Sequence, residues 1–183
     1  MEINYYIQFY SDWHCGSGLS SGADMDLLVV KDQNELPYVP GKTVKGLLRE
    51  ALMNYCEFKK IKLNIDELMG KEGELTSTLF FSNAELCEEE RYIIVATRSS
   101  SQLYRGIAST AINNDGIAKN GSLRKMQVTI PCCLEGTIYN VPEAYVGHFE
   151  KAMQLVKRMG QGRSRGLGRC DMRATHETKG GTR

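Results

Sequence analysis

The spacing of apolar residues changes along the chain from a period of two to a period of 3.6. Of all the sequence features, this change most restricts the folds that the chain can adopt. From Glu2 to Tyr10, β-forming residues alternate with polar ones, which predicts a strand with one buried face. Between Val44 and Cys56 the apolar residues recur at helical spacing, which predicts a helix. The helical face consists of Val44, Leu47, Leu48, Ala51, Leu52, Tyr55 and Cys56. The chain must therefore combine strands with helices.

The start of this helix carries a group of cations. The two prolines of Leu36–Gly41 require an extended segment, so the helix follows it, with Thr43 as its expected cap. Lys42, Lys45 and Arg49 share a second face near the N-terminus, where unpaired N–H groups and the helix dipole favour anions. The alternative interpretation is three solvated cations on a polar face.

The remaining patterns complete an α+β arrangement. Residues 98–125 predict a long, exposed β-hairpin arm. A capping box of Asn140, Pro142 and Glu143 predicts a last helix that ends at Gly160. The order β-α-β-β-α-β with a hairpin arm predicts a ferredoxin-like, RRM-like fold. The other expected elements are a loop at 11–23, a polar turn at Asp32–Glu35, and strands at Leu27–Val30, Thr78–Ser82, Tyr92–Thr97, Met126–Ile130, Leu134–Asn140 and Cys170–Ala174.

Composition limits the class of protein. The 183 residues suit one domain, and 42% hydrophobic and 25% charged residues argue against a disordered chain or a coiled coil. We therefore expect a single domain at 1–177 and a disordered tail at 178–183. The six cysteines have no Cys-x-x-Cys spacing, and the chain has no secretion signal or bilayer-length apolar run. These features predict a cytoplasmic protein with reduced thiols, without zinc and without a membrane partner.

The net charge of +1 results from a cancellation between segments. Residues 57–92 contain nine acidic and five basic side chains, whereas residues 98–125 contain one acidic and five basic side chains. The uneven distribution, rather than the total, is compatible with a nucleic-acid partner.

The glycine- and arginine-rich segment Gly160–Arg169 is the strongest local motif. It follows a helix and precedes a strand, so it is neither a P-loop nor a dinucleotide fingerprint. Glycine allows the backbone to approach a ligand closely, and Arg163 and Arg165 offer guanidinium groups suited to phosphate oxygens. A glycine-rich turn with solvated arginines, or a disordered RGG-type tract, would have the same composition.

Two acids and one histidine are candidates for chemistry. Asp24 and Asp26 precede the expected strand at Leu27–Val30, where a carboxylate could hold Mg²⁺ or position a hydroxyl for attack on a phosphate. They could equally be solvated acids of a loop. His14 could act as a general base or have a structural role.

Five motifs occur in order along the chain. They are Asp12–Gly18 (DWHCGSG), Leu36–Arg49 (LPYVPGKTVKGLLR), Leu79–Ala84 (LFFSNA), Ile112–Ala118 with Ser122–Arg124, and Gly162–Arg169 (GRSRGLGR). In this order they resemble the RAMP superfamily of CRISPR-associated proteins, particularly the backbone subunits of type III RNA-guided effector complexes. The corresponding family motifs are an early glycine loop, PYIPGSSLKGxLR, FFSDA, the thumb hairpin and the C-terminal glycine-rich loop. Asn83 stands where the family motif usually has Asp.

The resemblance implies a role and assigns residues to it. Family members of this kind bind the CRISPR guide RNA in a basic groove and stack as several copies, together with other RAMP subunits and the large subunit. The match of Asp26–Asp32 (DLLVVKD) to the family's DSPVIRD implies that Asp26 cuts target RNA with Mg²⁺, with Asp24 as the second choice. The residues expected to bind RNA are Lys42, Lys45, Arg49, Arg124, Arg163 and Arg165.

Three hypotheses follow. The first is a guide-binding backbone subunit that also cuts target RNA. The second is a structural RNA-binding subunit of the same complex without cleavage activity. The third is a repeat-processing endonuclease with His14 as general base, although such enzymes usually carry two ferredoxin-like domains.

Overall fold

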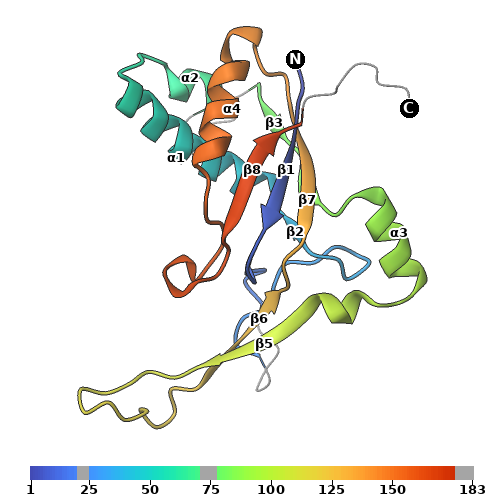
Figure 1. The fold of residues 1–183 in the computed structure, drawn as a ribbon, viewed down its shortest axis with the longest axis vertical. Coiled ribbons are helices and arrows are strands. Elements are labelled where there is room, and N and C mark those ends of the chain that lie inside the picture. The colour runs from blue at the N-terminus through green and yellow to red at the C-terminus, as the bar shows by residue number, and fades with distance from the viewer. Residues whose placement is uncertain (20–24, 71–77, 176–183) are drawn as a thin grey trace.

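The body of the protein is a six-stranded antiparallel sheet with the strand order β2-β4-β7-β1-β8, and β3 also pairs with β7 (Figure 1). This computed structural model describes residues 1–19, 25–70 and 78–175. The expected tail at 178–183 and Asp24 lie outside the described residues. The strands are β1 (Ile3–Phe9), β2 (Tyr38–Val39), β3 (Phe80–Phe81), β4 (Ala84–Glu85), β7 (Cys133–Tyr139) and β8 (Cys170–Ala174).

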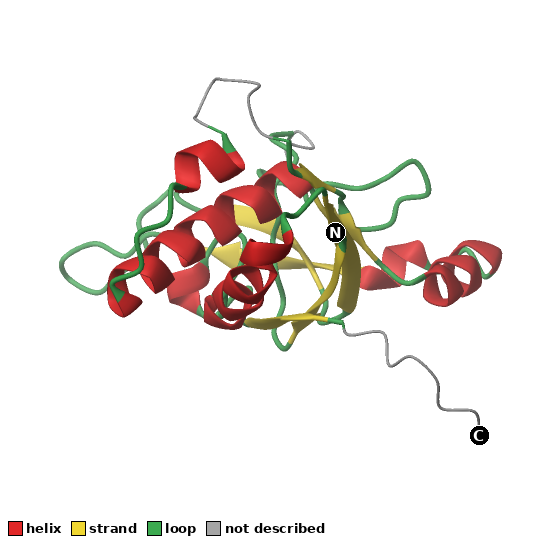
Figure 2. Cartoon of the chain, turned by 90° about the horizontal axis from the view of Figure 1, so that it is seen from above, coloured by secondary structure: helices red, strands yellow, loops and turns green. Residues whose placement is uncertain are grey.

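Helices cover one face of the sheet. The helices α1 (Gly41–Lys59) and α4 (Val146–Leu155) pack against each other, and α4 also packs against β8. Figure 2 shows these helices on one side of the sheet and α3 (Glu88–Ala96) on the other. The short α2 (Ile65–Met69) packs on α1. The fold class predicted from the sequence, α+β and ferredoxin-like, is confirmed.

The alternation in β1 determines which face the helices cover. Ile3, Tyr5, Ile7 and Phe9 are buried, whereas the residues between them are exposed or half-buried. Because successive side chains of a strand point to opposite faces, the even-numbered residues of β1 lie on the face opposite α1 and α4. This second face is called the open face below.

The amphipathic pattern of α1 is confirmed, but its expected cap is wrong. Val44, Leu48 and Leu52 are fully buried. Pro40 is the N-cap residue, and its carbonyl accepts the N–H groups of Thr43 and Val44, without a side-chain cap. Because the backbone of Pro40 already supplies this acceptor, the Thr43 side chain has no capping role.

The predicted arm is present as a separate two-stranded sheet. The strands β5 (Tyr104–Ser109) and β6 (Arg124–Thr129) pair in antiparallel register and project away from the body (Figure 1). A short 3₁₀ helix, η1 (Ser100–Leu103), leads into the arm. The strand predicted at 126–130 is therefore the returning half of the arm.

Two predicted strands are wrong. The segment predicted as a strand at Tyr92–Thr97 belongs to α3, whose first turn contains three glutamates that favour the positive end of the helix dipole. Leu27–Val30 forms isolated bridges rather than a regular strand. Only Val29 is buried there and Leu27 is 39% exposed, so this stretch does not lie within the core.

The last helix begins later and ends earlier than its sequence predicts. Asn140 has a positive φ of 61° and its side-chain amide donates to the Thr78 carbonyl, so it forms no capping box. A 3₁₀ turn, η2 (Glu143–Tyr145), precedes α4. The helix ends at Leu155 because Val156 turns to an extended conformation, and Val156 and Met159 are buried outside the helix.

Two further observations concern the class of protein. No helix in the described part of the chain is long and apolar enough to cross a membrane. The six cysteines are free thiols, and three of them, Cys15, Cys56 and Cys170, are buried.

Candidate nucleic-acid interface

The glycine-rich segment is a closed loop with an exposed basic tip. The Met159 N–H donates to the Gly168 carbonyl (2.8 Å), which closes its base. A side chain on Gly168 would collide with the Met159 carbonyl, and Gly168 also has a positive φ of 67°, so the position requires glycine. The tip is a 3₁₀ turn, η3 (Arg163–Arg165), whose arginines are exposed. The order of this loop argues against a disordered RGG-type tract.

A short segment after β1 holds the loop in place through main-chain atoms. The Gly168 N–H donates to the Asp12 carbonyl (2.7 Å), and the Gln161 N–H donates to the His14 carbonyl (2.9 Å). Gly160 packs so closely on the His14 carbonyl that a side chain there would collide with it. The loop therefore has a fixed position against residues 12–14, which we call the junction.

The junction also holds the base of the arm. The Arg105 Nε of β5 donates to the buried carboxylate of Asp12 (2.6 Å). The Trp13 backbone exchanges two hydrogen bonds with Thr129 of β6 (3.0 and 2.8 Å). No local sequence pattern predicts the Asp12–Arg105 pair, because the two residues are 93 positions apart. Loop and arm are thus held by the same three residues.

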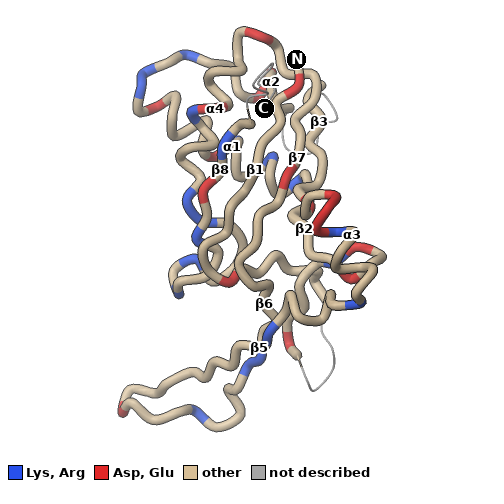
Figure 3. Tube along the Cα trace, turned by 45° about the vertical axis from the view of Figure 1, so that its right-hand side comes forward, with Lys and Arg blue, Asp and Glu red and all other residues tan. Residues whose placement is uncertain are grey.

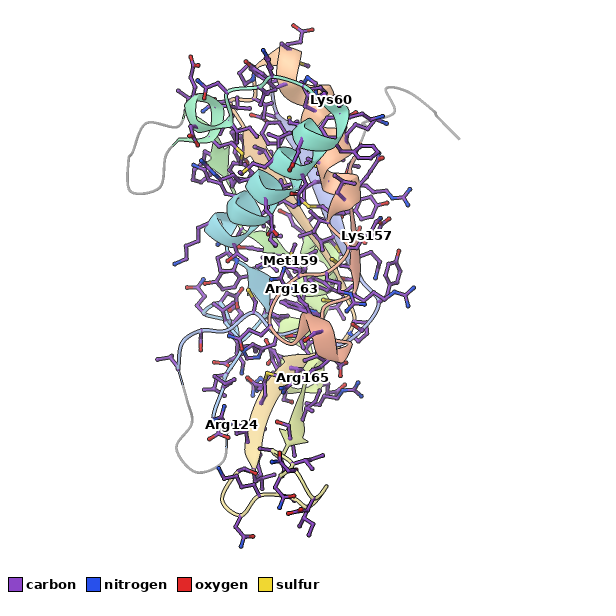
Figure 4. All side chains as sticks on the ribbon, turned by 90° about the vertical axis from the view of Figure 1, so that its left-hand side faces the viewer. Lys60, Arg124, Lys157, Met159, Arg163 and Arg165 are labelled. Atoms are coloured by element: carbon purple, nitrogen blue, oxygen red, sulfur yellow. The ribbon has the colours of Figure 1, made fainter. Side chains whose placement is uncertain are left out.

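This arrangement brings two of the predicted RNA-binding residues together. Arg124 at the start of β6 and Arg165 of the loop tip line one pocket of about 450 Å³, together with arm residues between Ser109 and Ser122. In Figure 4, Arg163, Arg165 and Arg124 follow one another along one side of the molecule. Guanidinium groups in this arrangement can bind phosphate oxygens with paired hydrogen bonds.

The three cations of α1 do not act as one group. Lys42 is exposed and lines a second pocket, of about 590 Å³, with Gly16 and Ser17 of the early glycine loop. Lys45 is half-buried, and burial lowers the pKa of its ammonium group, as does the nearby charge of Arg49. Lys42 is therefore the one of the three best placed to meet a phosphate.

Arg49 has partners within the protein. Its guanidinium pairs with Asp66 and donates to the Gly70 carbonyl (2.5 Å), so it ties α1 to α2 and the residue that follows α2. Binding a phosphate would require it to leave these partners. The structure thus places Arg49 in a helix–helix contact.

Asp26 lies beside the start of β6, at the end of the β5–β6 ladder that is farther from the junction. Its carboxylate accepts the Lys125 N–H (2.7 Å), and its own N–H donates to the Lys125 carbonyl (2.9 Å). Asp26 is exposed, so its carboxylate can meet a bound RNA.

The described residues contain no cluster of three or more His, Cys, Asp or Glu side chains that could hold a metal ion. Mg²⁺ is usually bound by one or two carboxylates together with substrate phosphates and water. Asp26 could supply one such carboxylate, and RNA oxygens and water would have to supply most of the other ligands. Mg²⁺ bound in this way would stabilise negative charge on the phosphate.

His14 is fully buried. Its Nδ1 donates to the Gln127 carbonyl of β6 (2.6 Å), which adds a further link between the junction and the arm. This position favours the structural role that the sequence left open, because a general base must reach its substrate.

Acidic side chains gather away from this interface. Glu85, Glu88 and Glu135 line a pocket of about 680 Å³ beside β4 and β7. In Figure 3, Asp and Glu concentrate around α3 and β7, whereas Lys and Arg lie beside β8 and at the base of the arm. The near-neutral chain is therefore polarised, as the distribution of charge along the sequence predicts.

A ferredoxin-like sheet, a hairpin arm and a basic glycine loop held at one junction define a small α+β protein with a polarised surface. A model of the RAMP superfamily matches residues 6–171, and the chain belongs to that superfamily. A search of curated protein sequences found no significant match.

Two solved structures have a similar fold. One is a chain of type III-B Cmr-beta bound to cognate target RNA, with a TM-score of 0.74, 11% identity, and coverage of 95% of this chain and 97% of that chain. The other is a chain of the apo state of type III-B Cmr-beta, with a TM-score of 0.72, 13% identity, and coverage of 97% and 98%. At these identities the similarity establishes the fold alone.

Proposed function

We propose that this chain is a guide-RNA-binding backbone subunit of a type III RNA-guided effector complex, acting in the cytoplasm with other RAMP subunits and the large subunit. The observation that carries the proposal is the shared pocket of Arg124 and Arg165 between arm and loop. Membership of the RAMP superfamily and the fold shared with type III-B Cmr-beta support it. Arg124, Arg163, Arg165 and Lys42 would bind guide phosphates, with Lys45 beside them and Arg49 only after leaving Asp66.

The decisive experiment is to purify the protein with its natural partners and to sequence the RNA that accompanies it. CRISPR repeat and spacer sequences are expected. Ribosomal fragments, or no RNA, would contradict the proposal.

A paired variant localises the binding. Arg163→Ala/Arg165→Ala should reduce the amount of guide RNA recovered with the complex and flatten the salt dependence of binding, because each lost phosphate contact lowers the salt slope. The matched control is Lys59→Ala/Lys62→Ala, which removes the same charge from exposed positions at the far end of α1. Equal loss in both variants would indicate a non-specific charge effect.

Target cleavage is the finer part of this proposal. The exposure of Asp26 beside the start of β6, next to Arg124 of the shared pocket, favours it as the residue that supports cleavage of a phosphodiester bond in target RNA, with Mg²⁺. Asp26→Asn keeps an oxygen that can accept the Lys125 N–H but removes the charge, so it should abolish cutting without loss of guide RNA. Unchanged cutting by this variant would favour the alternative, a structural subunit whose Asp26 only caps the backbone of the arm.

A further inference from the structure

The open face of the sheet carries a second set of groups suited to nucleic acid. Tyr6 of β1 lies opposite Arg173 of β8 in the antiparallel register. The same register continues past the strand ends, where the Tyr10 N–H donates to the Arg169 carbonyl (2.8 Å). Tyr6 occupies an even position of β1 and faces away from α1 and α4, and Tyr10 lies just past the end of β1 with an exposed side chain. We call these four residues the tyrosine–arginine strip.

The ring of Tyr10 is accessible beside positive charge, and Tyr6 lies between Arg173 of β8 and Glu135 of β7. Tyr10 is 57% exposed, and the Arg169 guanidinium lies over its ring, 6.0 Å from the centroid. Tyr6 is half-buried, and the side chain of Arg173 is 60% exposed. At about 3.3 Å per residue, the four positions from Tyr6 to Tyr10 correspond to roughly 13 Å of extended chain.

The acid between the two pairs is neutralised. Asp171 accepts hydrogen bonds from Lys157 (2.5 Å) and from Arg173 (2.6 Å). Arg158 and Arg169 lie side by side in an antiparallel bridge and are both exposed. The side chains around the strip therefore carry a net positive charge.

The other half of the same face has the opposite character. Glu85 of β4 lies directly opposite Glu135 of β7, and Glu88 lines the same pocket. A polyanion that reaches the open face would be attracted to the β1–β8 half and repelled from the β4–β7 half.

We propose that the tyrosine–arginine strip binds single-stranded RNA, with bases stacked on Tyr6 and Tyr10 and phosphates held by Arg169 and Arg173. Aromatic rings on a basic surface are the usual means of binding single strands, since every base offers a π-face. The strip begins at Arg169, the last residue of the glycine-rich segment, so it extends the candidate interface around the edge of β8. An acidic peptide could use the two arginines but would not need the exposed ring of Tyr10 beside them.

The test uses the purified full chain and a fluorescein-labelled 12-residue oligouridylate, with binding followed by anisotropy. Tyr10→Ala should weaken binding at least about fivefold, because stacking of one base is worth about that factor or more. Tyr10→Phe keeps the ring and should stay within about twofold. Tyr139→Ala is the matched control, since Tyr139 lines the acidic pocket of the same sheet. Melting temperatures of all variants verify that each is folded.

Crosslinking separates the strip from the guide-binding interface. With 4-thiouridine in the oligonucleotide, ultraviolet light should crosslink RNA to Tyr6 or Tyr10, and Arg163→Ala/Arg165→Ala should retain this crosslink. Equal binding by Tyr10→Ala and the parent protein, together with displacement of the RNA by oligoglutamate through Arg169 and Arg173, would identify a protein contact and overturn the proposal. Because this test needs no guide RNA, its failure would leave the guide-binding proposal intact, and the reverse also holds.

Discussion

The glycine-rich loop and the arm meet at the same junction, yet they are held by different kinds of interaction. Main-chain hydrogen bonds to Asp12 and His14, and glycines that allow close approach, hold the loop. The arm uses side chains as well, through the Asp12–Arg105 pair and the Asp26 carboxylate on Lys125. The difference indicates that the loop is fixed by backbone shape, whereas the position of the arm depends on a few side chains that substitution can remove.

The largest effect should come from the loop. Gly168→Ala forces a side chain onto the Met159 carbonyl at a positive φ of 67°, and should lower the free energy of unfolding by about 3 kcal/mol or more. Urea unfolding measures this loss. Gly166→Ala is the control, because Gly166 also has a positive φ but open space around it, and should cost about 1 kcal/mol. Equal costs for the two variants would mean that close approach is not what fixes the loop.

The next effect should come from the link between junction and arm. Asp12→Ala removes a buried carboxylate that accepts hydrogen bonds from Arg105, and should cost about 2 kcal/mol. The amides of β5 should also exchange with solvent faster, while those of β8 stay protected. Hydrogen exchange measures both. Unchanged exchange in β5 would show that the links from Trp13, His14 and Asp26 to β6 hold the arm without Asp12.

A smaller effect is expected at the second link. Asp26→Ala leaves the Lys125 N–H without its acceptor and should cost about 1 kcal/mol in thermal unfolding. Asp26→Asn retains an acceptor and should stay within about 0.5 kcal/mol of the parent. If both variants were as stable as the parent, water would be replacing the carboxylate.

The smallest effect concerns pH at the base of the loop. The hydrogen bond from Lys157 is the main cause that lowers the pKa of Asp171, with a further contribution from Arg173, while burial opposes it. Since this pKa is lower in the folded state, its contribution to stability is present above the ordinary value near 3.8 and is lost as the pH falls through the folded-state value.

Lys157→Gln should therefore reduce the loss of stability on acidification, by a few tenths of a kcal/mol, because Lys157 is largely exposed. Melting temperatures at about pH 3 and pH 6 measure the difference. Lys151→Gln on the exposed side of α4 should leave the pH dependence unchanged. A parallel change in both variants would assign the effect to net charge.

The sequence predicts secondary structure best where a pattern of apolar residues fits only a strand or only a helix. The alternation in β1 and the apolar face of α1 are local, and the structure has both. The strand predicted at Tyr92–Thr97 is wrong because short apolar runs occur in strands and helices alike. The three glutamates of the first turn stabilise the helix α3 there. Tyr92 and Ile93 are exposed, so the apolar character of this segment does not mark a buried strand.

The individual residues of the candidate interface could be predicted from the sequence, but their arrangement in space could not. The motifs indicate Arg124 and Arg165, and the fold brings them to one pocket. Arg49 belongs to another motif of the same set, the segment Leu36–Arg49, but it pairs with Asp66, a partner 17 positions away that no local pattern identifies. The position of His14 similarly depends on its hydrogen bond to the Gln127 carbonyl of the arm, 113 residues further along the chain. Contacts of this range follow from the topology rather than from spacing.

The two hydrogen bonds between Asp26 and Lys125 link this carboxylate to the outer end of the β5–β6 ladder. Arg124, the neighbour of Lys125, lines the pocket that it shares with Arg165. Because Asp26 is bonded to β6 through both its backbone N–H and its carboxylate, a displacement of this end of β6 would move the carboxylate and the Arg124 side chain together.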